Sequence, residues 1–243
     1  MPLPVYSGIA TEYDRLLGGL ARRTWLTGIL TEVASLELPE NAVVIDLGAG
    51  TGIGGALLSG MSTAWQLIGV DRSSAMLAQA ADHYGAVHIG DIAQLPLRAD
   101  SADLFVAGFD SLNYLPAEQL DRCLAEARRC LRPGGKFIFD YSSPHLLRDQ
   151  WRSLAYDQQI VGDGTLAWCH EWDSGSLRST SQVRRFGPDG ELRWAETHTQ
   201  YAFDAYELGA ACSRHGLRVE RVRDLERQDF TPMANTHVWT LAA

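Results

Sequence analysis

Three carboxylates stand at the ends of apolar segments in the first half of the chain, and glycines follow the first of them. The carboxylates belong to Asp46, Asp71 and Asp91, and the glycine segment is Gly48-Ala49-Gly50-Thr51-Gly52. Glycine allows positive φ angles and close approach of a ligand to the backbone. A carboxylate at the end of a strand can accept hydrogen bonds from both hydroxyls of a ribose. The pattern therefore predicts a site for a small, polar, ribose-containing ligand.

The spacing of these residues discriminates between two kinds of nucleotide ligand. The glycines of residues 50–55 satisfy the pattern G-x-G-x-x-G, but a dinucleotide fingerprint begins immediately after its strand, whereas here the segment 46–49 intervenes. Asp71 lies 19 residues after Gly52, a separation that also suits NAD. An NAD site does not require the third acid, Asp91, so the set favours a different ligand.

A further segment, Leu131-Arg132-Pro133-Gly134-Gly135-Lys136, leads into the apolar run 137–139 and Asp140. Together with the three acids and the glycine segment, it closely resembles the class I S-adenosylmethionine-dependent methyltransferases, and the resemblance covers nearly the whole chain. It implies S-adenosylmethionine as the cofactor. It also implies a Rossmann-like α/β fold, with a mostly parallel seven-stranded sheet whose last strand is antiparallel.

The resemblance also assigns the cofactor residues. The glycines would approach the methionine part of the cofactor with Asp46 beneath them, Asp71 would accept from the ribose hydroxyls, and Asp91 would accept from the adenine amino group. Phe109 would lie near the sulfonium, and Tyr13 belongs to a Tyr-Asp pair that closes over the cofactor in such relatives. The complete predicted cofactor set is Tyr13, Asp46, Gly48, Ala49, Gly50, Gly52, Asp71, Arg72, Met76, Asp91, Ile92 and Phe109.

Composition limits the size and the partners of the protein. The 243 residues, 46% of them hydrophobic, suffice for one α/β domain with an appendage. A net charge of −9 argues against nucleic acid or an anionic membrane as a partner, because those surfaces require clustered Lys and Arg. The four cysteines have no C-x-x-C spacing, no metal site is evident, and no apolar run reaches the length of a membrane span. We expect a cytoplasmic protein, monomer or homodimer, that acts on a small molecule.

Hydrophobic periodicity divides the chain into three parts. Residues 1–40 contain two amphipathic helical patterns, which we interpret as a cap whose first helix, over 6–18, is a lid. Alternating strand and helix patterns over 41–144 and 204–243 predict the parallel, cofactor-binding core. The remaining segment, 145–203, alternates polar and apolar residues between two turns, 173–176 and 187–190, and predicts a three-stranded antiparallel meander.

The two turns also define a register for this meander. If each turn consists of those four residues, His170, Ser179 and His198 form one cross-strand row. Trp168 and Glu196 then share the same face, which mixes indoles with polar groups as ligand pockets do. The face could instead pack against the core, with its polar groups satisfied locally.

The residues of this face are the candidates for chemistry. His198 is the first candidate for a general base, with Glu196 and His170 as its neighbours, because histidine commonly exchanges a proton near neutral pH. A base is needed only if the acceptor must lose a proton, so His198 could equally orient the substrate. The predicted substrate residues are Tyr6, Asp110, Asn113, Tyr114, Trp168 and Trp194, and the segment 110–115 resembles one in small-molecule members of the family.

The favoured function is transfer of a methyl group from S-adenosylmethionine to a nitrogen or oxygen atom of a small molecule by in-line displacement. Two alternatives remain open on the sequence. One is an enzyme of the same fold that modifies a peptide or uses the cofactor for another reaction. The other is a regulatory module that binds the cofactor without turnover, against which the intact Asp46, Asp71 and Asp91 argue.

Overall fold

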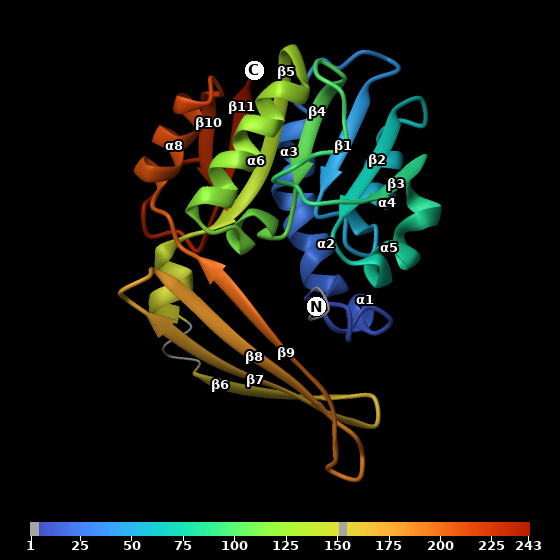
Figure 1. Ribbon diagram of the computed structural model, residues 1–243, viewed down its shortest axis with the longest axis vertical. Helices are drawn as coiled ribbons and strands as arrows, with labels where there is room; N and C mark the ends of the chain where they lie inside the picture. Colours follow the sequence, from blue (N-terminus) through green and yellow to red (C-terminus); the bar gives the residue numbers. More distant parts are fainter. Residues whose placement is uncertain (1–4, 151–154) are drawn as a thin grey trace.

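The computed structural model describes residues 5–150 and 155–243, which form two β-sheets and their covering helices (Figure 1). The larger sheet has seven strands in the order β10-β11-β5-β4-β1-β2-β3. Its strands are β1 (Val43–Leu47), β2 (Gln66–Asp71), β3 (Ala86–Ile89), β4 (Ala102–Ala107), β5 (Leu131–Ser142), β10 (Arg218–Asp224) and β11 (Thr236–Ala242). Strand β11 is antiparallel to both β5 and β10, while the pairs that join β5, β4, β1, β2 and β3 are parallel. The predicted Rossmann-like fold with an antiparallel last strand is confirmed.

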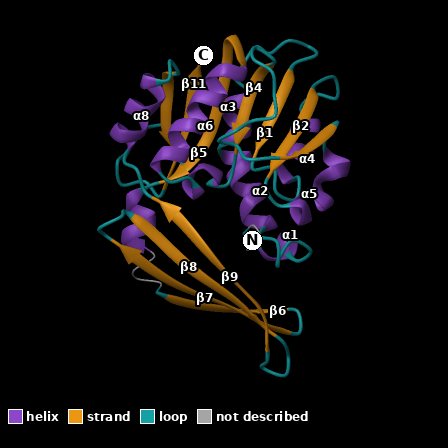
Figure 2. Ribbon diagram, in the orientation of Figure 1, coloured by secondary structure: helices purple, strands orange, loops and turns teal. Residues whose placement is uncertain are grey.

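Helices cover both faces of this sheet (Figure 2). They are α2 (Gly18–Thr27), α3 (Ile29–Val33), α4 (Ile53–Ser59), α5 (Ser74–Ala80), α6 (Ala117–Cys130) and α8 (Ala205–Arg214). Alternate residues of β4 enter different cores: Leu104 and Val106 pack with α2, α3 and α4, whereas Phe105 and Ala107 pack with α6 and α8. A strand buried on both faces has an apolar residue at nearly every position. The continuous apolar runs of the sequence follow from this two-sided burial.

A capping box marks the point where the chain returns to the core. The Asp204 carboxylate accepts from the Glu207 amide at 2.8 Å, and the Glu207 carboxylate accepts from the Asp204 amide at 3.0 Å. These two bonds satisfy amides that the first turn of α8 leaves free. Helix α8 therefore begins at Ala205, directly after its cap Asp204. The predicted insert ends at residue 203, immediately before this cap.

The N-terminal segment is less helical than its apolar pattern predicts. Residues 5–12 form turns, and the helix that follows, α1, spans only Tyr13–Leu16. Tyr6 has a φ of 68°, outside the helical range. The amides of Tyr6 and Gly8 donate to Glu196 of the insert instead of to a helical carbonyl. The expected single helix over 6–18 is wrong because a tertiary partner takes its first hydrogen bonds.

The insert is a four-stranded antiparallel sheet, and not the three-stranded meander predicted. Its order is β6-β7-β8-β9, with β6 at Tyr156–Val161, β7 at Gly164–Asp173, β8 at Arg178–Phe186 and β9 at Leu192–Tyr201. Strand β6 is an edge strand exposed at every residue except Val161, so its sequence lacks the alternation that burial of one face produces. The two-residue turn Gly162-Asp163, in which Gly162 has a φ of 60°, was the signal for this additional hairpin.

The register of the insert differs from the predicted one by two residues at both turns. Asp173 pairs with Arg178 across the first turn because the Asp173 carboxylate caps that turn from within the strand. The second turn has five residues, 187–191, instead of four, and a β-bulge between Arg185 and Phe186 adds the second residue of the shift. The cross-strand row is therefore His170–Ser181–His198, and the predicted place of Ser179 in it is wrong. A shift of two residues keeps every side chain on its face, so the predicted face survives the change of partner.

The antiparallel sheet lies beyond the carboxyl ends of the parallel strands, on the same side of the core as α1 and the start of α2 (Figure 1). This is the edge where ligands bind in open α/β sheets. Among the helices of the described residues, none combines the length and the apolar character that crossing a bilayer demands.

Candidate functional site

Two neighbouring cavities lie at the carboxyl edge of the parallel sheet and share part of their lining. One has a volume of about 720 Å³ and is lined by the glycine segment after β1; we call it the glycine-loop cavity. The other has a volume of about 800 Å³ and is lined by β9 and the β10–β11 connection; we call it the insert cavity. Tyr6, Phe109 and Tyr114 line both. These three aromatic residues therefore form the junction between the two cavities.

The glycine-loop cavity gathers most of the predicted cofactor residues. Those that line it are Tyr13, Gly48, Ala49, Gly50, Asp71, Arg72, Met76, Ile92 and Phe109. The Asp71 carboxylate holds the loop by accepting from the Gly50 amide at 2.9 Å, and it also accepts from the Ser73 amide at 2.8 Å. Gly48 has a φ of 76°, and a Cβ there would lie 2.5 Å from the Ser111 hydroxyl. The loop can approach a ligand only because glycine occupies this position.

Three predicted cofactor residues, Asp46, Gly52 and Asp91, do not line the cavity. Asp46 is 1% exposed and accepts from the Tyr84 hydroxyl at 2.5 Å, and burial raises the pKa of its carboxyl to about 7. Gly52 has a φ of 89°, and a Cβ there would lie 3.0 Å from the Ala80 Cα. Asp91 accepts from the Ala93 amide at 2.9 Å. Asp46 and Gly52 thus support the shape of the loop, and the role of Asp91 toward adenine stays a prediction.

The sequence did not predict several residues of the glycine-loop cavity, and Thr51 and Trp25 are the most informative of them. Thr51 lines the cavity and donates to the Asp14 carboxylate at 2.5 Å, which ties the glycine segment to α1. Trp25 of α2 lies against Gly54 and Gly108, where a Cβ would collide with its indole. Glycines at the start of α4 and just after β4 were the available signal for a large neighbouring side chain.

The N-terminal segment is tied to the insert through one carboxylate. Glu196 on β9 accepts from the Tyr6 amide at 2.7 Å and from the Gly8 amide at 2.5 Å. Its Oε2 also lies 3.3 Å from the His198 Nε2. Burial alone would raise the pKa of Glu196, but the bonds from His198, Gly8 and Tyr6 hold it below its ordinary value. Glu196 lines neither cavity. Through its bonds to the Tyr6 and Gly8 amides, it tethers the segment that carries Tyr6 to the insert.

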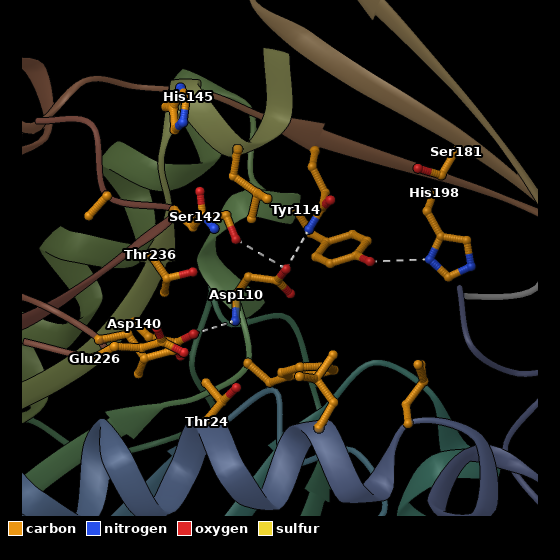
Figure 3. Close-up of a pocket in the computed structure, with 18 of the residues that line it drawn as sticks. Thr24, Asp110, Tyr114, Asp140, Ser142, His145, Ser181, His198, Glu226 and Thr236 are labelled. Atoms are coloured by element: carbon orange, nitrogen blue, oxygen red, sulfur yellow. Dashed lines mark hydrogen bonds between the residues drawn. The ribbon is translucent and has the colours of Figure 1, made fainter. Parts of the chain in front are cut away.

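The predicted catalytic histidines have different surroundings. His198 lines the insert cavity, and its Nδ1 lies 3.2 Å from the Tyr114 hydroxyl at the junction (Figure 3). Its ring also lies 4.5 Å from that of Tyr6, edge to face. His170 lines neither cavity, and its Nδ1 lies 2.7 Å from the Ser181 hydroxyl. Of the row His170–Ser181–His198, only Ser181 and His198 reach the cavity.

The predicted substrate residues divide between the cavity and its support. Tyr6, Asp110, Tyr114 and Trp168 line the insert cavity, whereas Asn113 and Trp194 line neither cavity. Asn113 is fully buried, and its amide nitrogen donates to the backbone carbonyl oxygens of Ser142 and Tyr201. It therefore joins the core to the end of β9. Trp194 packs against the small apolar cluster of the insert.

An acidic pair in the insert cavity was not predicted as a pair. Asp140 of β5 is 1% exposed, and its Oδ2 accepts from the Asp110 amide at 3.1 Å (Figure 3). The Asp110 carboxylate accepts from the Gln200 amide group at 2.9 Å and from the Ser142 hydroxyl at 3.4 Å. Burial raises the pKa of Asp110 to about 7 and that of Asp140 to about 8, and for Asp140 the neighbouring Asp110 adds to the effect. The signal for Asp140 was its place at the end of an apolar run, as for the three acids before it.

The chain is similar to known methyltransferases in sequence and in structure. A profile described as a methyltransferase domain matches residues 44–135. The malonyl-[acyl-carrier protein] O-methyltransferase of Geobacter sulfurreducens is 30% identical over 198 residues, 79% of this chain and 62% of that protein. The chain spans 44–62% of the length of three curated relatives that are 30–36% identical to it over the matched parts.

Two solved structures share its fold over nearly the whole length. An S-adenosylmethionine-dependent methyltransferase from Clostridium acetobutylicum has a TM-score of 0.81 at 20% identity, covering 98% of this chain and 99% of its own. The CcbJ methyltransferase of Streptomyces caelestis has a TM-score of 0.78 at 22% identity, covering 97% of this chain and 96% of its own. Both matches include the antiparallel insert as well as the parallel core.

Proposed function

Because the chain belongs to the class I S-adenosylmethionine-dependent methyltransferase family, we propose that it transfers a methyl group from this cofactor to a nitrogen or oxygen atom of a small molecule. The cofactor would occupy the glycine-loop cavity and the acceptor the insert cavity. The observation that carries the proposal is the junction of the two cavities at Tyr6, Phe109 and Tyr114. Two ligands in contact across this junction would be aligned for direct transfer.

The residues of the glycine-loop cavity fit S-adenosylmethionine. Gly48 leaves the loop free of side chains where the methionine part would lie, and Asp71 offers a carboxylate for the ribose hydroxyls. Met76 and Ile92 offer apolar contact for the adenine ring. When bound, this cofactor supplies a methyl group on a sulfonium that is already activated for displacement.

The protein's own contribution is alignment and exclusion of water. Holding two reactants in contact can lower a barrier by about 7–11 kcal/mol, and Tyr6 is placed to cover the junction where that contact would occur. We assign Glu196 to hold the N-terminal segment in this closed position, through its bonds to the Tyr6 and Gly8 amides. We propose that His198, which lies beside the Tyr114 hydroxyl, contacts the acceptor.

The names of its relatives cover three kinds of acceptor atom. They include the O-methyltransferase named above, a ubiquinone/menaquinone C-methyltransferase and a sugar N-methyltransferase. The acceptor of this chain therefore has to be argued from its own cavity. A volume of about 800 Å³ suits a metabolite and supports the choice of a small molecule over a folded protein.

The test is product analysis after incubation with methyl-labelled S-adenosylmethionine and a metabolite extract. The expected result is a compound heavier by one methyl group that carries the label. Asp71→Asn is the matched control, because it keeps the shape of the side chain and removes the charge at the ribose. The amount of labelled product should fall in this variant together with its affinity for the cofactor. Cofactor binding by calorimetry without any labelled product from the extract would contradict the proposal and favour a non-catalytic module. A labelled peptide would favour an enzyme of the same fold with a different acceptor.

A further inference from the structure

The insert cavity contains the buried carboxylate of Asp140 and the half-buried carboxylate of Asp110, and no cationic side chain of the described residues pairs with either. Asp110 and Asp140 line the same wall, and the Oδ1 of Asp140 is buried without a hydrogen-bond partner (Figure 3). Within residues 5–150 and 155–243, no lysine, arginine or histidine forms an ion pair with either of them, and the charge that acts on Asp140 is that of Asp110. A buried carboxylate without a counter-ion is costly, because burial takes its charge out of water and a hydrogen bond from an amide replaces only part of the hydration.

The other acids of the same cavity are satisfied by the protein. Asp224 accepts from the Thr231 amide at 2.8 Å and from the Thr231 hydroxyl at 3.0 Å. Glu226 is exposed at the rim and pairs with Arg23 at 2.7 Å. The fold therefore supplies partners for acids at this cavity, and the open oxygen of Asp140 is the exception.

The backbone around the pair is held in an uncommon conformation. Phe109 and Asp110 follow β4 with φ angles of 57° and 55°, a region that non-glycine residues seldom adopt. The bond from the Asp110 amide to Asp140 fixes this turn, and the turn directs the Asp110 carboxylate to Gln200 and the cavity. Phe109 itself belongs to the junction. The acidic pair is thus placed next to the point where the two proposed ligands would meet.

We propose that Asp110 and Asp140 bind the amino group of the acceptor as an ammonium ion and take a proton from it. The proposal rests on the proposed function and makes it more specific: the acceptor is a primary or secondary amine. Tyr6, Tyr114 and Trp168 line the same cavity and suit an organic cation, since aromatic faces attract positive charge. A metal ion fits less well, because the described residues form no group of three acids, histidines or cysteines that could hold one.

The proton balance of this step is simple. An N–H bond of the ammonium breaks, its electron pair stays on nitrogen as a lone pair, and the proton forms an O–H bond with a carboxylate oxygen of the pair. The neutral amine is then able to act as a nucleophile. The raised pKa values of the two carboxyls, about 7 and about 8, bring them closer to the pKa of an ammonium than an exposed carboxyl would be.

The test compares amines with alcohols of the same shape. Benzylamine, cyclohexylamine and 2-phenylethylamine, each with its corresponding alcohol, are titrated by calorimetry into protein saturated with S-adenosylhomocysteine. At pH 8 we expect at least one amine to bind at least tenfold more tightly than its alcohol. Asp140→Asn should weaken binding of that amine at least tenfold. It should change the affinities for the alcohol and for the cofactor less than twofold, because asparagine can still accept from the Asp110 amide. Asp121→Asn is the charge control, because Asp121 lines neither cavity, and it should change the amine affinity less than twofold.

The pH dependence of the wild-type protein gives a second measurement that needs no variant. Amine affinity should rise as the pH increases through 7–8, where the pair ionises, while alcohol affinity stays constant. The other titratable or charged groups that face this cavity are Tyr6, Tyr114, His145, His198, Asp224, Glu226 and Arg227. Asp110→Asn leaves all of these groups in place, so it should flatten the slope if the acidic pair causes it.

The outcomes separate this inference from the proposed function. Equal affinity for amine and alcohol in all three pairs, or an unchanged amine affinity in both Asp→Asn variants, would overturn the amine site. Labelled products found only among hydroxyl compounds would also overturn it and would leave methyl transfer to a small molecule intact. A clear amine preference without any labelled product would support the site and refute the transfer reaction.

Discussion

Replacement of Asp140 by asparagine should make the protein more stable at alkaline pH. Asp140 is 1% exposed, and burial raises the pKa of its carboxyl from 3.8 to about 8. Between these values the folded state keeps a proton that the unfolded state has released. The free energy of unfolding therefore falls as the pH rises through this window, at no more than about 1.4 kcal/mol per pH unit for one group.

The magnitude follows from the length of the window. The window of about four pH units sets an upper bound of roughly 6 kcal/mol, and the usual cost of an unsatisfied buried polar group is about 1–3 kcal/mol. We expect Asp140→Asn to be about 1–3 kcal/mol more stable than the wild type at pH 8.5, and equal to it within about 0.5 kcal/mol at pH 4.5. For a chain of this length, that difference corresponds to an increase of roughly 2–10 °C in Tm at pH 8.5.

The assay is urea unfolding followed by tryptophan fluorescence at both pH values, with Asp121→Asn as the control of opposite sign. Burial of Asp121 acts to raise its pKa, but its bonds with Arg214 and His215 hold that pKa below the ordinary value. Its removal should cost a few tenths of a kcal/mol at high pH, because surface ion pairs contribute little. If Asp140→Asn is less stable than the wild type at pH 8.5, the ionised carboxylate is stabilised inside the protein, and the reasoning about uncompensated charge is refuted.

Three further changes test other parts of the site. Asp71→Ala should weaken binding of S-adenosylmethionine at least tenfold by calorimetry, since charge-assisted bonds to a ribose contribute about 1.5–3 kcal/mol; an unchanged Kd would remove the ribose assignment. Glu196→Ala should speed the release of S-adenosylhomocysteine at least fivefold in stopped-flow measurements, because the Tyr6 and Gly8 amides lose their acceptor; equal release rates would contradict the tether. His198→Ala should raise the acceptor KM about tenfold and leave kcat within about threefold if the acidic pair takes the proton, whereas a ~10²-fold fall in kcat would identify His198 as the base.

Local sequence determined the parallel core and its glycine loop. The apolar runs that end in Asp46 and Asp71 correspond to β1 and β2. A strand covered on both faces must be apolar along its length, and a loop that approaches a ligand must contain glycine, so these features are visible without any knowledge of the fold. The face of β9 that carries His198 was predictable for the same kind of reason, because side chains alternate along a strand.

The strand register within the insert depended on contacts that the sequence pattern does not reveal. Shifting both turns by two residues leaves the alternation unchanged, so no hydrophobic pattern distinguishes Ser179 from Ser181 as the partner of His198. The capping of the first turn by Asp173 decided it, together with the longer second turn and the β-bulge beside that turn. Strand β6 went unnoticed because an exposed edge strand has no buried face to impose a pattern.

Only the tertiary structure decided which polar groups meet. Glu196 and the Tyr6 amide are 190 positions apart, and Asp110, in the turn after β4, is 30 positions from Asp140 on the neighbouring strand β5. The buried pair of Glu32 and Arg223 joins α3 to β10 across 191 positions. A single carboxylate has the same sequence signature whether it tethers a segment, pairs with arginine or faces a cavity. Its role follows from the groups that folding brings within about 3 Å of it, because desolvation and hydrogen bonding act over that distance.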